Sequence, residues 1–265
     1  MLVEAVHGHR CELGESPRWD AARGELVWTD VPAGRVHRAG WDGRRLDAGT
    51  VAEYPGPVPL CLPGVVVAVG PTLWWLDPVA AVELPVPPGH RCNDGGLDRR
   101  GRLLVGSMAG DAAAGQGALW SVEPGSAPRR LIGAATVPNG LCFSPDGGLL
   151  YWVDSGPRTL SVFEYDQGTG ELGRRRARWR LGDGAAKPDG MAADPDGMLW
   201  IALWDGGRVV RVDPATGATL ATVELPADKP TACCFGGPGR DVLFVTTAAR
   251  GSDDPRAGLV YAVRL

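Results

Sequence analysis

The chain has 265 residues, of which 44% are hydrophobic, and it carries a formal net charge of −4 with a sequence pI near 5.6. This composition is ordinary for a globular protein with a large core, and its mild acidity argues against nucleic acid as a partner. No apolar run approaches the roughly 18 residues needed to span a bilayer. The N-terminus lacks a basic segment followed by an apolar core. We therefore expect a cytoplasmic protein without a signal peptide or a membrane partner.

Helical periodicity is almost absent, and short runs rich in Val, Leu, Trp and Thr alternate with turn clusters such as Pro-Asp-Gly. This pattern predicts β-strands separated by turns. In chain order, the strands group into six units, at residues 14–39, 59–76, 91–122, 137–166, 187–213 and 230–265. The second unit is the most degenerate of the six.

Units four and five contain the clearest internal repeat. Each reads Pro, then Asn139 or Asp189, then Gly, a small or apolar run, a Pro-Asp-Gly turn and a second apolar run, and the two copies lie 50 residues apart. A repeat of that length is one supersecondary unit. Because Asn139 and Asp189 occupy the same place in the repeat, an arrangement of the units around an axis would direct both side chains at one spot.

Six units spaced by roughly 34 to 50 residues, each with three or four strands, predict an all-β six-bladed β-propeller around a central channel. Six blades use residues 1–265 and leave no room for a second domain, so we expect a single domain. A propeller must close its ring, and we expect a strand at about residues 3–10 to pair with the strand at 259–265. A β-sandwich is the alternative, but the repeated Asp/Asn-Gly openings favour the radial arrangement.

Polar residues open the inner strand of several units. Glu15, Asn93, Asn139 and Asp189 lie at or near this position, which faces one mouth of the channel. Two carboxylates and two amides converging on one point would be costly to desolvate unless a cation lay between them. Oxygen ligands suit Ca²⁺, Mg²⁺ or Mn²⁺, and Zn²⁺ also accepts carboxylates. The pattern therefore predicts one divalent metal ion in the central channel.

A structural interpretation competes with this hypothesis, because Asp-Gly and Asn-Gly are also common turn dipeptides. We interpret Asp146 and Asp196, in the two Pro-Asp-Gly segments, as turn residues of this kind. Asn139 and Asp189 differ from them, since a separate Asp-Gly turn follows each at nearly the same distance. Glu15 precedes Ser16-Pro17 rather than a glycine.

The cysteines and histidines do not form a sequence motif. None of the six cysteines forms a Cys-x-x-Cys pair, so we expect free thiols. Cys142, Cys233 and Cys234 fall on predicted inner strands and are interpreted as small packing residues. The four histidines are spread along the chain and are interpreted as surface or core residues: His7, His9, His37 and His90.

Six motifs follow one another along nearly the whole chain. They are Leu13-Gly14-Glu15-Ser16-Pro17-Arg18-Trp19, Arg91-Cys92-Asn93-Asp94-Gly95, Pro138-Asn139-Gly140-Leu141, Pro188-Asp189-Gly190-Met191, the run at 206–214, and Cys233-Cys234-Phe235-Gly236-Gly237. In this order they resemble the SMP-30/gluconolactonase/regucalcin family of six-bladed propellers.

The resemblance implies roles for three of the polar residues. In that family the glutamate of the first motif, the asparagine of Pro-Asn-Gly and the aspartate of Pro-Asp-Gly bind one divalent metal. Those positions are Glu15, Asn139 and Asp189 here. The aspartate is also the family's candidate general base, which implies a catalytic role for Asp189. Ca²⁺ or Zn²⁺ is the favoured ion, and Mg²⁺ and Mn²⁺ remain possible.

The resemblance also implies substrate contacts. The arginine and asparagine of the second motif point to Arg91 and Asn93. An acidic residue shortly after Gly-x-Met-Ala often contacts sugar hydroxyls in the family, and here it is Asp111, which is shorter than the glutamate alternative. Ala232 stands after Pro230-Thr231, where a polar serine or asparagine would be expected.

These expectations combine into a metal-dependent lactonase, which opens a five- or six-carbon aldonolactone to its aldonic acid. It would act on a small-molecule sugar lactone as a monomer or weak homo-oligomer. Two alternatives stay open. One is a hydrolase of a phosphotriester or non-sugar lactone, which a channel mouth lined by Trp120, Trp179 and Trp204 would favour. The other is a non-catalytic calcium-binding propeller, which a metal fully enclosed by protein ligands would favour.

Overall fold

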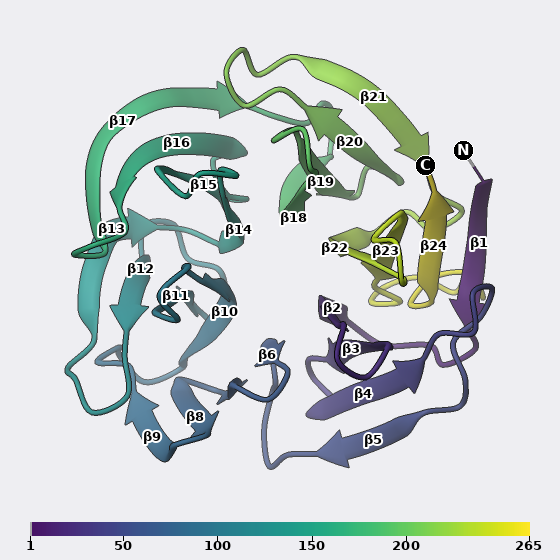
Figure 1. Ribbon diagram of the computed structural model, residues 1–265, viewed down its shortest axis with the longest axis horizontal. Coiled ribbons are helices and arrows are strands. Elements are labelled where there is room, and N and C mark those ends of the chain that lie inside the picture. The colour runs from purple at the N-terminus through teal and green to yellow at the C-terminus, as the bar shows by residue number, and fades with distance from the viewer. Residues whose placement is uncertain (1) are drawn as a thin grey trace.

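A computed structural model of the chain describes residues 2–265, and within that range it contains 24 β-strands and no helix. The strands form six four-stranded antiparallel sheets, arranged as blades around a central axis (Figure 1). The predicted all-β six-bladed propeller is confirmed. Across residues 2–265, no helix is long and apolar enough to cross a membrane.

Each blade runs from an inner strand at the axis to an outer strand at the rim (Figure 1). Blades one to three contain β2 (Gly14–Asp20), β3 (Glu25–Asp30), β4 (Arg35–Gly40) and β5 (Thr50–Glu53); β6 (Leu60–Leu62), β7 (Val66–Val69), β8 (Thr72–Leu76) and β9 (Val79–Glu83); and β10 (His90–Leu97), β11 (Leu103–Ala109), β12 (Gly117–Val122) and β13 (Arg129–Ala135). Blades four to six contain β14 (Pro138–Phe143), β15 (Leu149–Asp154), β16 (Thr159–Asp166) and β17 (Glu171–Arg180); β18 (Lys187–Ala193), β19 (Leu199–Trp204), β20 (Arg208–Val212) and β21 (Thr219–Glu224); and β22 (Pro230–Gly236), β23 (Val242–Thr247), β24 (Val260–Arg264) and β1 (Leu2–His7).

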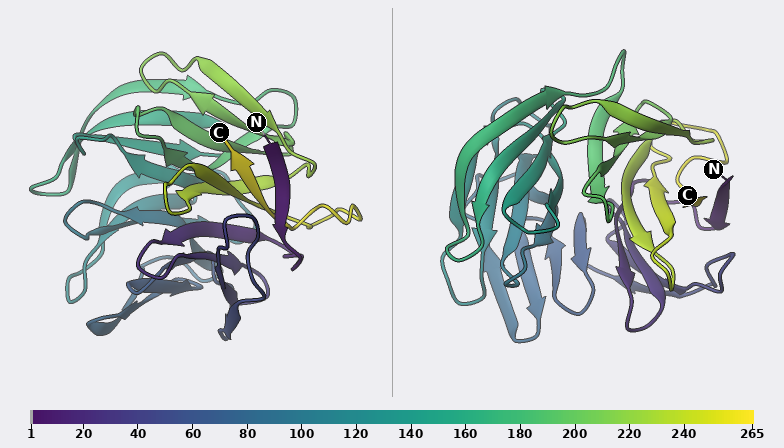
Figure 2. Two further views of the ribbon diagram at one scale, coloured as in Figure 1. Left: turned by 45° about the vertical axis from the view of Figure 1, so that its right-hand side comes forward. Right: turned by 45° about the horizontal axis from the view of Figure 1, so that its top comes forward.

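The two ends of the chain close the ring. β1 pairs antiparallel with β24 and completes blade six, with Leu2 opposite Arg264 and His7 opposite Val260. Figure 2 shows both termini at this blade. The predicted pairing is confirmed, although the strand ends at His7 rather than near residue 10.

Hydrophobic clusters fill the interfaces between neighbouring blades. Val27 of β3 joins the cluster between blades one and two, whereas its neighbours Leu26 and Trp28 join the cluster between blades six and one. Successive side chains of a strand point to opposite faces of the sheet. Because both faces of a blade are covered, the middle strands are continuous apolar runs, which explains the sequence pattern.

Five of the six inner strands break their pairing register near the start. The shifts occur in β2, β10, β14, β18 and β22, and they fall at or next to Glu15, Asn93, Asn139 and Asp189. A β-bulge bends the strand and re-aims a side chain. β6 pairs with β7 without a shift and is apolar throughout Leu60–Leu62. The bulges therefore mark the blades that present polar groups at the axis.

Two smaller predictions are also confirmed. Asp146 and Asp196 lie in turns that end at Gly147 and Gly197, whose φ angles are 77° and 79°. All six cysteines are free thiols in the described part of the chain, and Cys142, Cys233 and Cys234 lie on inner strands.

Candidate functional site

Buried carboxyl groups meet at the axis of the propeller. Asp94 is only 8% exposed and Asp189 only 6% exposed. Burial raises the pKa of Glu15 to about 8, and the charge of Asp94 adds to that effect. Burial also raises the pKa of Asp189 well above its usual range, with further contributions from Glu15 and Asp94. Carboxyl groups that are buried close together resist ionisation, because their negative charges repel one another and are removed from water. A positive charge placed between them would therefore stabilise their ionised forms.

Three predicted metal ligands each retain a free oxygen lone pair. Glu15 uses Oε2 to accept the Ser16 backbone N–H at 3.0 Å, which leaves Oε1. Asn139 Oδ1 accepts one hydrogen bond and has a second lone pair. Asp189 Oδ1 is buried and has no hydrogen-bond partner among residues 2–265. An unsatisfied buried oxygen of this kind points to an ion or a water, and hard oxygen donors fit a divalent cation.

A chain of hydrogen bonds fixes this site across three blades. Asn93 Nδ2 in blade three donates to Asn139 Oδ1 in blade four at 2.8 Å. Asn139 Nδ2 donates to Ser155 Oγ at 2.9 Å, and the Ser155 hydroxyl donates to the Pro188 carbonyl in blade five at 2.6 Å. Pro188 precedes Asp189, so the predicted ligands of blades four and five are held by one network. Ser155 was not predicted from the sequence, because its position carries no repeated motif.

Arg91 brings positive charge to the carboxyl groups. Its Nη1 donates to Asn93 Oδ1 at 2.6 Å and to the Cys92 carbonyl at 2.9 Å. Burial lowers the pKa of the Arg91 guanidinium, and the nearby charges of Glu15 and Asp189 oppose that effect. The structure therefore brings Arg91 and Asn93 together with the three predicted ligands.

Asp94 is a further site residue that the sequence interpretation missed. Its Oδ1 accepts hydrogen bonds from Arg18 Nη2 at 3.2 Å and from the Gly95 backbone N–H at 2.7 Å. Arg18 also donates to the Gly95 carbonyl at 2.8 Å, so it ties blade one to blade three. The sequence did hold a signal for it, because Asp94 directly follows Asn93 in the same motif and adds a third carboxylate to Glu15 and Asp189.

Asp111 lies apart from this network. It is exposed in the turn after β11, and its Oδ1 accepts the Ala113 backbone N–H at 3.0 Å. Arg91 pairs with Met108 near the end of β11, which places the turn at the same end of blade three. A contact between Asp111 and a substrate stays a prediction.

The glycines that follow the ligands have a steric role. A Cβ added at Gly140 would lie 2.5 Å from the backbone oxygen of Asp189. A Cβ added at Gly190 would lie 2.3 Å from the Cβ of Ala232. Both distances are shorter than real Cβ contacts, so adjacent inner strands approach this closely only because glycine occupies these positions. Ala232, buried at this contact, supplies no polar group.

The fold and the site define a six-bladed β-propeller with an oxygen-rich, axial site suited to a divalent cation. The family described as "SMP-30/Gluconolactonase/LRE-like region" matches residues 13–249. Regucalcin from Homo sapiens is 36% identical over an alignment 281 positions long, which covers 98% of this chain and 93% of that protein. The chain therefore belongs to the SMP-30/gluconolactonase/regucalcin family, and the resemblance stated from the motifs is confirmed.

Two solved structures support the same relationship. A luciferin-regenerating enzyme superposes with a TM-score of 0.88 at 27% identity, covering 100% of this chain and 95% of its own. The calcium-binding protein regucalcin from Agrobacterium tumefaciens superposes with a TM-score of 0.87 at 28% identity, covering 98% of this chain and 92% of its own.

Proposed function

We propose that this chain is a divalent-metal-dependent lactonase that opens a sugar (aldono-) lactone to the aldonic acid. Family membership supports a lactonase-like function. The observation that carries the proposal is the buried, unpartnered Oδ1 of Asp189, whose pKa is raised by burial and by the neighbouring Glu15. A site of this kind combines a place for a cation with a carboxylate that can exchange a proton.

Glu15, Asn139 and Asp189 would hold the ion. A bound divalent cation supplies Lewis acidity toward the lactone carbonyl. Its charge also favours the ionised forms of Glu15 and Asp189 at neutral pH, against the burial that favours their protonated forms. Ca²⁺ or Zn²⁺ is the favoured ion, with Mg²⁺ and Mn²⁺ as further candidates.

The protein's own groups account for the proton transfer. Asp189, as general base, would accept a proton from the attacking water. The water oxygen forms a bond to the carbonyl carbon, the bond from that carbon to the ring oxygen breaks, and Asp189 would pass the proton it accepted to the ring oxygen, which becomes a hydroxyl. Arg91 and Asn93 would orient the substrate hydroxyls from blade three, and Asp111 would reach them from the exposed turn.

Two of the three tryptophans considered for an apolar mouth lie elsewhere. Trp120 is buried, and its Nε1 donates to Ser107 Oγ at 2.8 Å. Trp179 lies on the outer strand β17 and donates to the Pro214 carbonyl at 3.0 Å. Trp204 packs under Lys229, whose Nζ lies 5.5 Å from the ring centroid. This arrangement supports a hydroxylated substrate over an apolar ester.

A second candidate is a propeller that binds Ca²⁺ without turnover. The description of the Agrobacterium tumefaciens relative as a calcium-binding protein favours it. In this case the same three oxygen ligands would bind the ion, and Arg91 would serve only to balance charge.

A metal add-back assay separates these functions. The chelated protein receives Ca²⁺, Zn²⁺, Mg²⁺ or Mn²⁺, and acid release is followed over a panel of aldonolactones, a non-sugar lactone and a phosphotriester. We expect metal-dependent hydrolysis of at least one aldonolactone. Failure with every sugar lactone and every metal would overturn the lactonase. Calcium binding without turnover would support the second candidate, and hydrolysis of the phosphotriester or non-sugar lactone alone would support a different esterase. Gel filtration checks the expected monomer or weak homo-oligomer.

A further inference from the structure

Three histidines and a cysteine gather where blade six meets blade one. His7 ends β1, His9 and Cys11 lie in the connection from β1 to β2, and His37 lies on β4. One nitrogen each of His9 and His37 and the sulfur of Cys11 lie within 4.8 Å of one another. His37 is buried and His7 and His9 are partly exposed, as expected of core or surface residues, and closure of the ring brings the N-terminal segment onto blade one, so that the three imidazoles become neighbours.

The cysteine of this cluster is buried, and each of its two histidines has a buried nitrogen without a hydrogen-bond partner. Cys11 is 0% exposed and His37 is 3% exposed. The Nε2 atoms of His9 and His37 are both buried, and neither has a hydrogen-bond partner in the described range. The two imidazole centroids are 4.4 Å apart, with ring planes at 38°. A buried polar atom without a partner is unfavourable, so two such nitrogens in one cluster point to a bound ligand.

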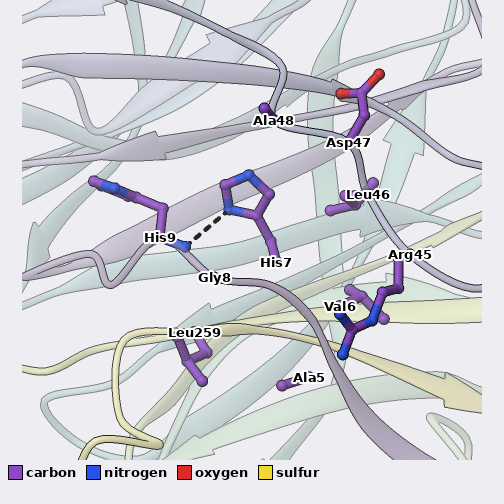
Figure 3. A pocket seen from close by; sticks show the side chains of 10 residues that line it. All are labelled: Ala5, Val6, His7, Gly8, His9, Arg45, Leu46, Asp47, Ala48 and Leu259. Atoms are coloured by element: carbon purple, nitrogen blue, oxygen red, sulfur yellow. Dashed lines mark hydrogen bonds between the residues drawn. The ribbon is translucent and has the colours of Figure 1, made fainter.

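Neighbouring rings hold the cluster in place. His7 Nδ1 accepts the backbone N–H of His9 at 3.2 Å, as Figure 3 shows. The Trp28 indole stacks on the His37 imidazole with 5.1 Å between centroids and an interplanar angle of 11°. The His7 ring packs against the same indole in a T-shaped arrangement, with 4.9 Å between the ring centroids. These contacts restrict the rotamers of the donor side chains, so part of the ordering needed for metal binding is present in the fold.

We propose that His9, Cys11 and His37 form a second metal site, separate from the axial oxygen site, which takes a borderline transition-metal ion, Zn²⁺ first among them. Two imidazoles and a thiolate are ligands that Zn²⁺ prefers and that Ca²⁺ and Mg²⁺ do not. Zn²⁺ bond lengths of about 2.0–2.3 Å in a tetrahedral site put ligand atoms about 3.5 Å apart. Metal binding would draw the three donor atoms, now within 4.8 Å of one another, to that spacing. The Cys11 thiol releases its proton to solvent as the sulfur–metal bond forms.

The position of the site gives it a consequence for the fold. The ion would join the segment that follows β1 to strand β4 of blade one, across the joint that closes the ring. A cavity of about 510 Å³ borders it, lined in part by His7, His9 and Leu46, and offers a route for the ion and for water in the fourth coordination position (Figure 3). Zn²⁺ binding therefore stabilises ring closure.

Cobalt substitution tests the site directly. Co²⁺ bound to a thiolate gives a sulfur-to-metal charge-transfer band, which the oxygen ligands of the axial site cannot produce. Chelated, reduced wild-type protein titrated with Co²⁺ should develop this band with saturation at one equivalent of thiolate-bound metal, and Zn²⁺ should abolish it. Cys11→Ser should lose the band. Cys61→Ser, which removes another buried thiol from the interface of blades one and two, should keep it.

Stability gives a second measurement. Zn²⁺ should raise the unfolding midpoint of the wild type and of Cys61→Ser, and the increase should be reduced in His9→Gln, a change at a partly exposed loop residue that tests the site even if Cys11→Ser does not fold. Absence of the charge-transfer band in the wild type would overturn the proposal. Its persistence in Cys11→Ser would do so as well, because another cysteine would then be the ligand.

Discussion

The side-chain amide of Asn93 donates a hydrogen bond to Oδ1 of Asn139 at 2.8 Å and so joins blade three to blade four at the axis. Asn93 also accepts a hydrogen bond from Arg91 through Oδ1 at 2.6 Å. A residue expected to bind substrate is therefore also the group that orients a predicted metal ligand. The proposed substrate site and the proposed metal site therefore share this one amide.

Replacing Asn93 with Ala should weaken metal binding as well as substrate binding. Without its amide, Asn139 loses the donor that sets the direction of Oδ1, and loss of such a supporting bond typically lowers metal affinity about 10- to 100-fold. Calorimetric titration of the chelated protein with Ca²⁺ measures the effect. Asp111→Asn serves as the control, since Asp111 hydrogen-bonds in its own turn, and it should leave Ca²⁺ affinity unchanged. Equal affinities for Asn93→Ala and the wild type would contradict this shared role.

Replacing Asp189 with Asn should reduce lactonase turnover by about 10²- to 10⁴-fold, the usual contribution of a general base. The amide keeps the size of the side chain but cannot accept the proton of water at neutral pH. Steady-state kinetics on the best lactone of the panel measures kcat. Asp196→Asn, in the turn of the same blade, changes a side chain that is 80% exposed and should retain full activity. Unchanged turnover in Asp189→Asn would remove this residue from the proposed chemistry.

Without metal, the free energy of unfolding should fall as pH rises through the range in which Glu15 and Asp189 ionise. Glu15 has a pKa of about 8 in the fold against 4.5 for the free side chain, and the pKa of Asp189 is also raised. The folded state then binds more protons than the unfolded state across this window, so the free energy of unfolding of the chelated protein should fall as pH rises from about 4.5 to about 8. Urea titrations at several pH values in the presence of chelator measure it.

Two controls accompany this measurement. Saturating Ca²⁺ should flatten the slope, because the cation favours the ionised carboxylates, and Glu15→Gln should reduce the slope without metal. If the free energy of unfolding of the chelated protein instead rises over the same pH window, the carboxyl groups are less crowded than the structure indicates.

The repeat explains why much of this site could be predicted. Equivalent positions in the repeat occupy equivalent places in successive blades, so Asn139 and Asp189 were expected on the inner strands of adjacent blades, where the structure places them. β1 had to pair with β24 because an open ring leaves unpaired edges. Ser155 could not be found in this way, since its role depends on a contact between the end of β15 and the next blade. His9, Cys11 and His37 could not either, because the path of the connection after β1 follows no periodicity.

Replacing Gly190 with Ala should destabilise the protein by about 1–3 kcal/mol through overpacking. The new Cβ would lie 2.3 Å from the Cβ of Ala232 on the next blade. Ala232→Gly in the same chain should recover part of the loss, because it removes that atom. Gly140→Ala offers the matched comparison: its Cβ would meet the backbone oxygen of Asp189, so Ala232→Gly should not rescue it. Thermal unfolding of the single and double variants decides the matter, and a Gly190→Ala variant as stable as the wild type would refute the steric role.

Asp194 should prove to be a structural carboxylate, in contrast to Asp189. Its Oδ1 accepts the Met198 backbone N–H at 2.9 Å, and its Oδ2 accepts Trp200 Nε1 at 3.1 Å and Arg211 Nε at 2.7 Å. Burial alone would raise its pKa, but the hydrogen bonds outweigh burial and the pKa is lowered. Asp194→Ala should therefore cost about 2–4 kcal/mol of stability, since it leaves buried donors unpaired.

The pH dependence of that loss distinguishes a charged partner from a packing effect. Because the folded pKa of Asp194 is depressed, its contribution is complete above the pKa of the unfolded chain and disappears as pH falls through the lower folded value. The difference in unfolding free energy between wild type and Asp194→Ala should thus be largest at neutral pH and shrink in acid. Asp196→Asn, in an exposed ion pair with Arg211, should change stability by only about 0–1 kcal/mol. A penalty for Asp194→Ala that is the same in acid as at neutral pH would mean that the side chain acts through its shape and not through its charge.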